Sequence, residues 1–164
     1  MNRRTTLIAL SASLALVAGP VAAQSAKSLV GTYTGVAFVV TDESGKKSDV
    51  FGTNPRALLV LTPDGRYSII VMRETLPKFA SNSRLKGTPE EHQAIVAGSL
   101  AHFGKYTIDE KDKSITFHVE SATYPNWDKI PQKRPFTVKG DLLSYKVTAA
   151  SGGGTAEVVW KRVK

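Results

Sequence analysis

The sequence predicts a mainly β protein, an antiparallel up-and-down barrel of about eight to ten strands with one α-helix. Three observations predict it. Short runs rich in β-branched and aromatic residues recur at even spacing between tight turns. A central hairpin over 54–73 is apolar on nearly both strand faces, which indicates a wall packed inside and covered outside. One segment, beginning at Thr88, has the features of a helix start.

Residues 1–23 are predicted to be a secretory signal peptide. A basic head over 1–4 precedes a mostly apolar, uncharged run over 7–18, and Val21-Ala22-Ala23 places small residues before a cut at Gln24. The run is shorter than the roughly 20 apolar residues of a membrane anchor. We therefore expect export to the periplasm or the extracellular medium, a mature domain over 24–164, and no stable membrane insertion after cleavage.

Composition argues against several classes of function. The chain has 22 basic and 14 acidic side chains, a formal charge of +8, but its lysines are scattered, so nucleic-acid binding is not expected. It has no cysteine, which excludes disulfides and thiol nucleophiles. It also has no phosphate loop, dinucleotide fingerprint or nucleophile elbow, so neither a cofactor nor covalent hydrolysis is expected.

The strands before the helix are predicted in order as follows. A first strand over 29–41 contains two glycines, which usually mark a bend or a close backbone approach. A short edge strand over 48–51 precedes the central hairpin, whose strands cover 57–61 and 67–72. They flank Thr62-Pro63-Asp64-Gly65, in which proline presets φ and glycine accepts the left-handed corner.

A long loop and the helix follow the hairpin. The loop over 74–87 is either a solvent-facing connection or a lid, and Phe79 and Leu85 favour a loop folded over the barrel. In the helix, Thr88 and Glu91 form a capping box, and Pro89 suits the first helical position. The helix is expected to run to residue 103 and, through an apolar stripe at 96, 100 and 103, to plug or flank the barrel.

Five further strands are predicted after the helix, over 105–109, 114–123, 134–139, 142–149 and 155–163. Most of them are joined by tight turns at 110–113, 139–141 and 152–154, which are rich in glycine, aspartate and lysine.

Ordered short motifs run through nearly all of the mature chain. They are Leu29-Val30-Gly31-Thr32-Tyr33, Phe51-Gly52-Thr53-Asn54-Pro55-Arg56, Thr62-Pro63-Asp64-Gly65, Phe79-Ala80-Ser81, Gly87-Thr88-Pro89-Glu90-Glu91, Phe103-Gly104-Lys105-Tyr106, His118-Val119-Glu120 and Pro125-Asn126-Trp127. With these motifs the chain resembles the bacterial lipocalin-like domain family, a branch within or near the calycin-type barrels. The resemblance implies a barrel with a ligand pocket.

The resemblance also implies how the base of the barrel closes. Lipocalins stack an arginine near the end of the chain on an aromatic residue of the first strand. That residue is usually tryptophan, and this chain has Tyr33 there. The resemblance thus implies that Arg162 covers Tyr33, a cation–π contact worth about 0.5–2 kcal/mol. We expect both residues, and Trp160, to be structural.

Two polar groups on one strand are candidates for chemistry. His118 and Glu120 share a strand face, opposite Ile115, Phe117 and Val119. If the pair faces the interior, the carboxylate can orient the imidazole for proton transfer. If the apolar residues fill the barrel, the pair lies in solvent. The strand pattern leaves both alternatives open.

The sequence also contains residues typical of two other kinds of site. The three histidines and Glu120 match no zinc-ligand spacing, so no metal is expected. Arg56, Arg73 and Arg134 each lie in phase with apolar neighbours, so each needs an anionic partner or must reach water. Either Glu120 or Asp128 supplies that partner, or an arginine holds the acid end of a lipid-like or aromatic ligand.

The sequence therefore predicts an exported protein that binds a small hydrophobic or amphipathic ligand, which can carry an anionic group, in a barrel pocket. The alternative is a non-hydrolytic enzyme, an isomerase or cyclase, that uses His118 and Glu120; a filled barrel acting as an interaction module is a third. In the binding hypothesis Arg73 and Arg134 lie near the mouth and Trp127 on the rim. The expected ligand-binding residues are Arg73, Tyr67, Tyr106, His118, Trp127 and Arg134.

Overall fold

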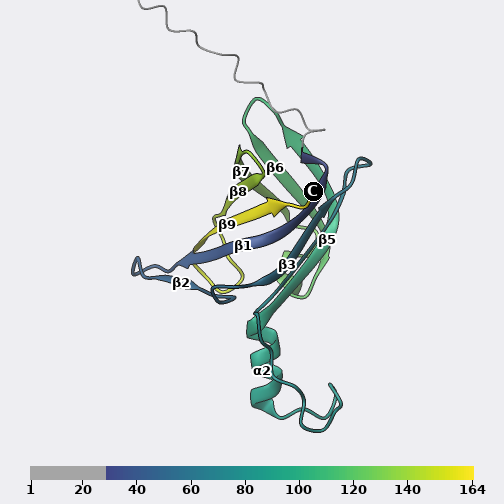
Figure 1. The fold of residues 1–164 in the computed structure, drawn as a ribbon, viewed down its shortest axis with the longest axis vertical. Coiled ribbons are helices and arrows are strands. Elements are labelled where there is room, and N and C mark those ends of the chain that lie inside the picture. Colours follow the sequence, from purple (N-terminus) through teal and green to yellow (C-terminus); the bar gives the residue numbers. More distant parts are fainter. Residues whose placement is uncertain (1–28) are drawn as a thin grey trace, which may run out of the picture.

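The first and last strands of the sheet pair with each other, so the sheet closes into an antiparallel barrel (Figure 1). The computed structural model describes residues 29–164, and the predicted signal peptide lies outside them. β2 pairs with β1 alone, so eight of the nine described strands form the barrel wall, which confirms the predicted fold class. The strands are β1 (Gly31–Thr41), β2 (Lys47–Asp49), β3 (Arg56–Leu61), β4 (Arg66–Met72), β5 (Ser99–Asp109), β6 (Ser114–Ala122), β7 (Pro131–Lys139), β8 (Leu142–Val147) and β9 (Thr155–Arg162).

The predicted central hairpin is formed by β3 and β4. Its turn has Gly65 at φ +81°, and the Gly65 N–H donates to the Thr62 carbonyl at 3.1 Å. Leu59 and Ile69 face the core, and each is at most 3% exposed. Leu58 and Ile70, which alternate with them on the outer face, are 40% and 38% exposed. The expectation of a covered outer face is therefore wrong, because the helix does not pack there.

One end of the barrel is closed by a buried aromatic cluster beneath Arg162. The Arg162 guanidinium lies over the Tyr33 ring at 4.8 Å and donates from Nη1 to the Val30 carbonyl at 2.6 Å. The Tyr33 hydroxyl donates to the Leu29 carbonyl at 2.7 Å. Trp160 is fully buried in the same hydrophobic core, where its Nε1 donates to the Tyr145 hydroxyl at 3.0 Å. The closure implied by the family resemblance, with Arg162 covering Tyr33, is confirmed.

The one α-helix of the described residues, α2 (Pro89–Gly98), begins as predicted and ends five residues early. The Thr88 side chain accepts from the Glu91 N–H at 3.2 Å, and the Glu91 carboxylate accepts from the Thr88 N–H at 2.8 Å. Ser99 then adopts extended backbone, and β5 begins there without a loop. The expected stripe at 96, 100 and 103 is therefore split between a helix and a strand. Alternation along β5 exposes Phe103 to 46%.

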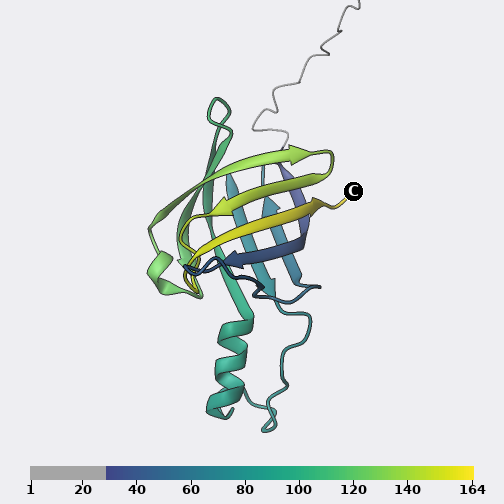
Figure 2. The ribbon, with the colours of Figure 1, turned by 90° about the vertical axis from the view of Figure 1, so that its left-hand side faces the viewer.

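The helix extends away from the open end of the barrel instead of plugging or flanking it (Figures 1 and 2). Its sequence is apolar at few positions, and Val96 is 77% exposed. The loop over 74–88 runs beside the helix: the Phe79 and His92 rings lie 5.6 Å apart, and the Ala80 N–H donates to Glu91 at 2.9 Å. The loop is thus held by the helix and does not fold over the barrel, which corrects the predicted lid.

A bulge in the middle of β5 depends on a glycine. The register between β5 and β6 shifts between Phe103 and Gly104. A Cβ at Gly104 would collide with the His118 carbonyl oxygen and would lie 2.8 Å from the Glu120 nitrogen. Only glycine allows the two backbones to approach this closely.

Candidate functional site

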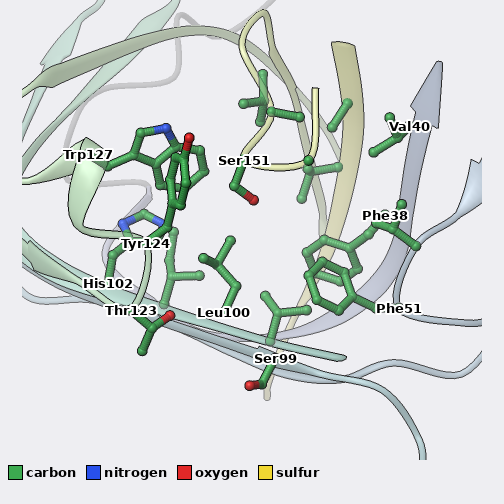
Figure 3. Close-up of a pocket in the computed structure, with 18 of the residues that line it drawn as sticks. Phe38, Val40, Phe51, Ser99, Leu100, His102, Thr123, Tyr124, Trp127 and Ser151 are labelled. Atoms are coloured by element: carbon green, nitrogen blue, oxygen red, sulfur yellow. The ribbon is translucent and has the colours of Figure 1, made fainter. Parts of the chain in front are cut away.

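The open end of the barrel leads into a cavity of about 480 Å³. This volume falls within the range of small-molecule sites in proteins, about 300–1,000 Å³. Most of the lining side chains are apolar or aromatic, and none of them is an aspartate or glutamate. In Figure 3, Trp127, Tyr124 and His102 lie on one side of the cavity and Phe38, Phe51 and Val40 on the other. The barrel is therefore hollow at one end and filled at the other.

Aromatic contacts fix the shape of both sides of the cavity. On one side, the Phe38 ring meets Phe51 at 5.7 Å and Trp160 at 5.1 Å, both edge to face. On the other, Trp127 meets His102 at 5.5 Å, also edge to face. Such pairs are worth about 0.5–1.5 kcal/mol beyond their buried area. These contacts hold the side chains of both walls in place.

Trp127 is positioned by a short 3-10 helix, η1 (Pro125–Trp127). The Asp128 carboxylate accepts from the Ala122 N–H at 2.7 Å, and the Lys129 N–H donates to the Val119 carbonyl at 2.9 Å. These bonds fasten the segment to the end of β6. Trp127 is 8% exposed, so the indole forms part of the cavity wall and is more buried than the predicted rim position implies.

Arg134 is the buried cation of the cavity. It lies on β7 opposite Ile115 of β6 and is 4% exposed. Its Cζ lies 5.3 Å from the ring centres of Phe117 and Tyr145 and 5.8 Å from that of Trp127. Its Nε and Nη2 have no hydrogen-bond partner among the described residues. Burial lowers the pKa of Arg134, while the hydroxyl of Tyr145 favours its charged form.

Neither acidic residue considered as an internal partner of Arg134 pairs with it. Glu120 binds Arg66 on the outer surface, with 2.8 Å between Nη2 and Oε2. Asp128 accepts the Ala122 N–H. The predicted internal salt bridge is therefore wrong. Arg134 also lies deeper than the mouth, where it was expected, because its strand position faces the same interior as Phe136.

A neutral Tyr67–His102 pair lies in the wall near Arg134. The Tyr67 hydroxyl and the His102 Nδ1 are 2.9 Å apart, and both side chains are buried. Burial, helped by the nearby charge of Arg134, lowers the pKa of His102 to about 3, and burial raises the pKa of Tyr67 well above its usual range. His102 is thus an uncharged polar group on the cavity wall at neutral pH.

The structure brings three of the six predicted ligand-binding residues to the cavity. They are Arg73, Trp127 and Arg134. Arg73 lies at the mouth and donates from Nε to the Val50 carbonyl at 3.1 Å. Tyr67 does not line the cavity, but its buried hydroxyl is hydrogen-bonded to His102, which does. Tyr106 lies in the filled half of the barrel, where its hydroxyl donates to the Thr62 carbonyl at 2.8 Å, so its expected place in the pocket is wrong.

His118 and Glu120 lie on the outside of the barrel. Phe117 and Val119 occupy the interior positions of β6, and strand alternation therefore turns the two polar residues to solvent. His118 Nε2 lies 3.1 Å from the Thr107 Oγ1. The expected position of His118 in the barrel pocket and the inward-facing catalytic pair are wrong. Both residues instead line a hollow on the outer surface, together with Lys105 and Lys129.

Sequence reasoning missed four residues that shape the cavity. Phe38 shares a strand face with Val40, and Tyr145 with Val147, in strands that were predicted, so their inward phase was an available signal. Tyr124 lies beside the predicted rim residue Trp127, at 5.6 Å between ring centres. His102 was hidden by the helix predicted to extend to 103, since its place in the wall requires β5 to begin at Ser99.

Two further properties concern residues 29–164 alone. They contain no group of three or more histidine, cysteine, aspartate or glutamate side chains arranged to bind a metal ion. None of their helices combines the length and the hydropathy needed to cross a bilayer.

Comparisons with known proteins identify the family of the chain. The family described as lipocalin-like domain matches residues 30–163. The 4'-hydroxy-3'-methoxypropiophenone carrier protein ppsC of Aspergillus oryzae is 32% identical over 79 residues, which are 44% of this chain and 71% of the relative. A solved structure of a redesigned β-barrel aligns with a TM-score of 0.42 and 14% identity over 86% of this chain and 96% of that chain. The chain therefore belongs to the lipocalin-like domain family.

Proposed function

We propose that this protein is a carrier that binds a small, largely apolar ligand inside the open end of its barrel. The observation that carries the proposal is the cavity of about 480 Å³ walled by aromatic side chains. A barrel whose interior were filled at both ends would bury more apolar area, so the cavity costs stability that a ligand can restore. The few polar side chains on its wall would orient the ligand.

The relative from Aspergillus oryzae supports the class of ligand. Its name describes a carrier of an aryl ketone with hydroxyl and methoxy groups on one ring. A molecule of that size fits within the volume of this cavity, and its ring could pack against Trp127 or Phe38. We therefore extend the class, a small aromatic or amphipathic compound, to this chain.

Calorimetric titration of the purified chain tests the proposal with two probes. They are 4'-hydroxy-3'-methoxypropiophenone and the fluorophore 1-anilinonaphthalene-8-sulfonate. Leu100, which lines the cavity, is replaced by tryptophan to fill it. Leu58, on the outer face, receives the same substitution as a control.

We expect L100W to weaken binding about tenfold or more and L58W to change it by less than about twofold, since only the first indole occupies the cavity. Binding of neither probe, or equal binding by the two variants, would overturn the proposal.

We further propose that the carrier is exported. The support is the basic head, the short apolar run and the small residues before Gln24. Expression of the full chain in a secreting host, followed by N-terminal sequencing, tests this. A mature protein outside the cytoplasm that begins at Gln24 is expected, and retention of an intact Met1 on intracellular protein would contradict it.

A further inference from the structure

The cavity contains a buried positive charge for which the described residues supply no counter-ion. Arg134 is 4% exposed and lines the cavity, and no acidic side chain lines it. Burying a charge is costly unless an opposite charge and hydrogen bonds compensate it. Among the described residues, no carboxylate forms an ion pair with Arg134.

The two unpaired nitrogens of Arg134 lie on one edge of its guanidinium. Nε–H and one Nη2–H point in parallel along that edge, which is the geometry that receives both oxygens of a carboxylate. The phenolic and carbonyl oxygens of a neutral ligand would satisfy one donor each and would leave the charge uncompensated. This edge is buried, so the guanidinium must turn toward the cavity to receive a ligand.

The surroundings of Arg134 favour an aromatic acid. Three rings surround the guanidinium at 5.3–5.8 Å, and Trp127 and Tyr145 also form part of the cavity wall. A flat ring attached to a carboxylate would continue this stack, with its body between the aromatic walls and its acid group at the cation. His102, uncharged and on the same wall, adds no competing charge.

We propose that the ligand is a small aromatic carboxylate whose acid group pairs with Arg134. This inference rests on the proposed carrier function and specifies its ligand. Arg134 then selects among compounds of similar shape by charge. Arg73 is the only other arginine of the cavity lining, and because it is exposed at the mouth, it contributes less to that selection.

A matched pair of probes tests the inference. trans-Cinnamate and cinnamamide have nearly the same shape and differ by one charge. Calorimetric titration of the wild-type chain at neutral pH should show cinnamate binding about tenfold tighter or more, because only the acid compensates the buried cation. The preference should persist in about 0.5 M NaCl, since a buried pair is screened much less than an exposed one.

Three variants assign the preference to a residue. R134M should reduce it to less than about threefold, and R134K, which keeps the charge but lacks the planar fork, should have an intermediate preference. R66M is the matched control and should keep the wild-type preference, because Arg66 pairs with Glu120 on the outer surface. If R134M does not fold, R134K still decides: a preference equal to that of the wild type in R134K overturns the paired geometry.

The outcomes separate this inference from the carrier function. Equal binding of cinnamate and cinnamamide by the wild type overturns the inference and leaves the carrier standing. A preference that survives in R134M or disappears in R66M also overturns it. If the wild type binds neither of these compounds and none of the probes of the carrier test, both proposals fall.

Discussion

Replacing Arg134 with methionine is expected to stabilise the ligand-free protein while weakening its function. The guanidinium is buried among three rings, and its Nε and Nη2 are unpaired within the described residues. Methionine has a similar length and no charge, and its sulfur makes favourable contacts with aromatic rings. Removing a buried cation that lacks a carboxylate partner should therefore favour the folded state.

The size of the effect follows from two opposing contributions. Two unpaired buried donors cost about 1–3 kcal/mol each, so their removal gains about 2–6 kcal/mol. The three cation–π contacts that are lost are worth about 0.5–1 kcal/mol each, and sulfur–aromatic contacts restore part of this. We expect a net gain of about 1–3 kcal/mol in the free energy of unfolding. At about 2–4 °C per kcal/mol for a chain of this size, the melting temperature should rise by about 2–12 °C.

Urea and thermal unfolding of wild type and R134M measure this difference. With cinnamate at about 100 times its dissociation constant, the free energy of unfolding of the wild type should rise by about 2.7 kcal/mol and that of the variant by much less. The difference in stability between the two proteins should therefore shrink or change sign. A ligand-free variant less stable than the wild type by about 1 kcal/mol or more, with an unchanged denaturant slope, would refute the reasoning. The ring contacts would then outweigh the unpaired donors.

Three further predictions concern other parts of the barrel. Burial lowers the pKa of His102 from 6.5 to about 3, so its contribution to stability is present above pH 6.5 and is lost as the pH falls toward 3. Between pH 7.5 and 5 the wild type should lose about 2 kcal/mol more than H102Q in urea titrations, and equal losses would contradict this. G104A should cost about 1–3 kcal/mol in the same assay because its Cβ meets β6 backbone, whereas a Cβ at Gly152 meets nothing within 4 Å and G152A should cost less than about 0.5. A G104A protein as stable as G152A would contradict the close approach. H118A and E120Q should each change the affinity for cinnamate, measured by calorimetry, by less than about twofold, because both residues lie outside the barrel. A tenfold loss of affinity in either variant would show that the pair contacts the ligand.

Local sequence signals predicted most of the fold correctly. The turn at Thr62–Gly65, the alternation in the central hairpin and the capping box at Thr88 each depend on residues close together in the chain. The same holds for the short strands after the helix, whose turns contain glycine and aspartate. The contact of Arg162 with Tyr33 was predicted from the family resemblance and not from local signals, since 129 positions separate the two residues.

The end of the helix could not be predicted from local signals. The stretch 99–103 has an apolar spacing that suits a helix, but in the barrel it pairs with β4, where Leu100 lies opposite Val71. Tertiary pairing thus replaced the local preference. This error also hid His102, whose phase in a strand, and not in a helix, places it in the cavity wall.

The strand pattern alone did not decide which face of β6 points inward. Ile115, Phe117 and Val119 alternate with His118 and Glu120, and either set could have faced the interior. Closure of the barrel decided it, because the three apolar side chains pack in the interior of the barrel, where Phe117 also contacts Arg134. The same closure placed Arg134 inside, away from the carboxylates expected to neutralise it.

By itself, the sequence determined an antiparallel barrel with one capped helix and a set of arginines in apolar phase. These features follow from turn chemistry, alternation and capping, which act over a few residues. Only the tertiary structure decided that the barrel is hollow at one end, that the helix leaves it, and that Arg134 is the buried charge of the cavity. The physical reason is that the phase of a strand becomes inside or outside only when the sheet closes, and closure joins β1 to β9 across the whole described chain.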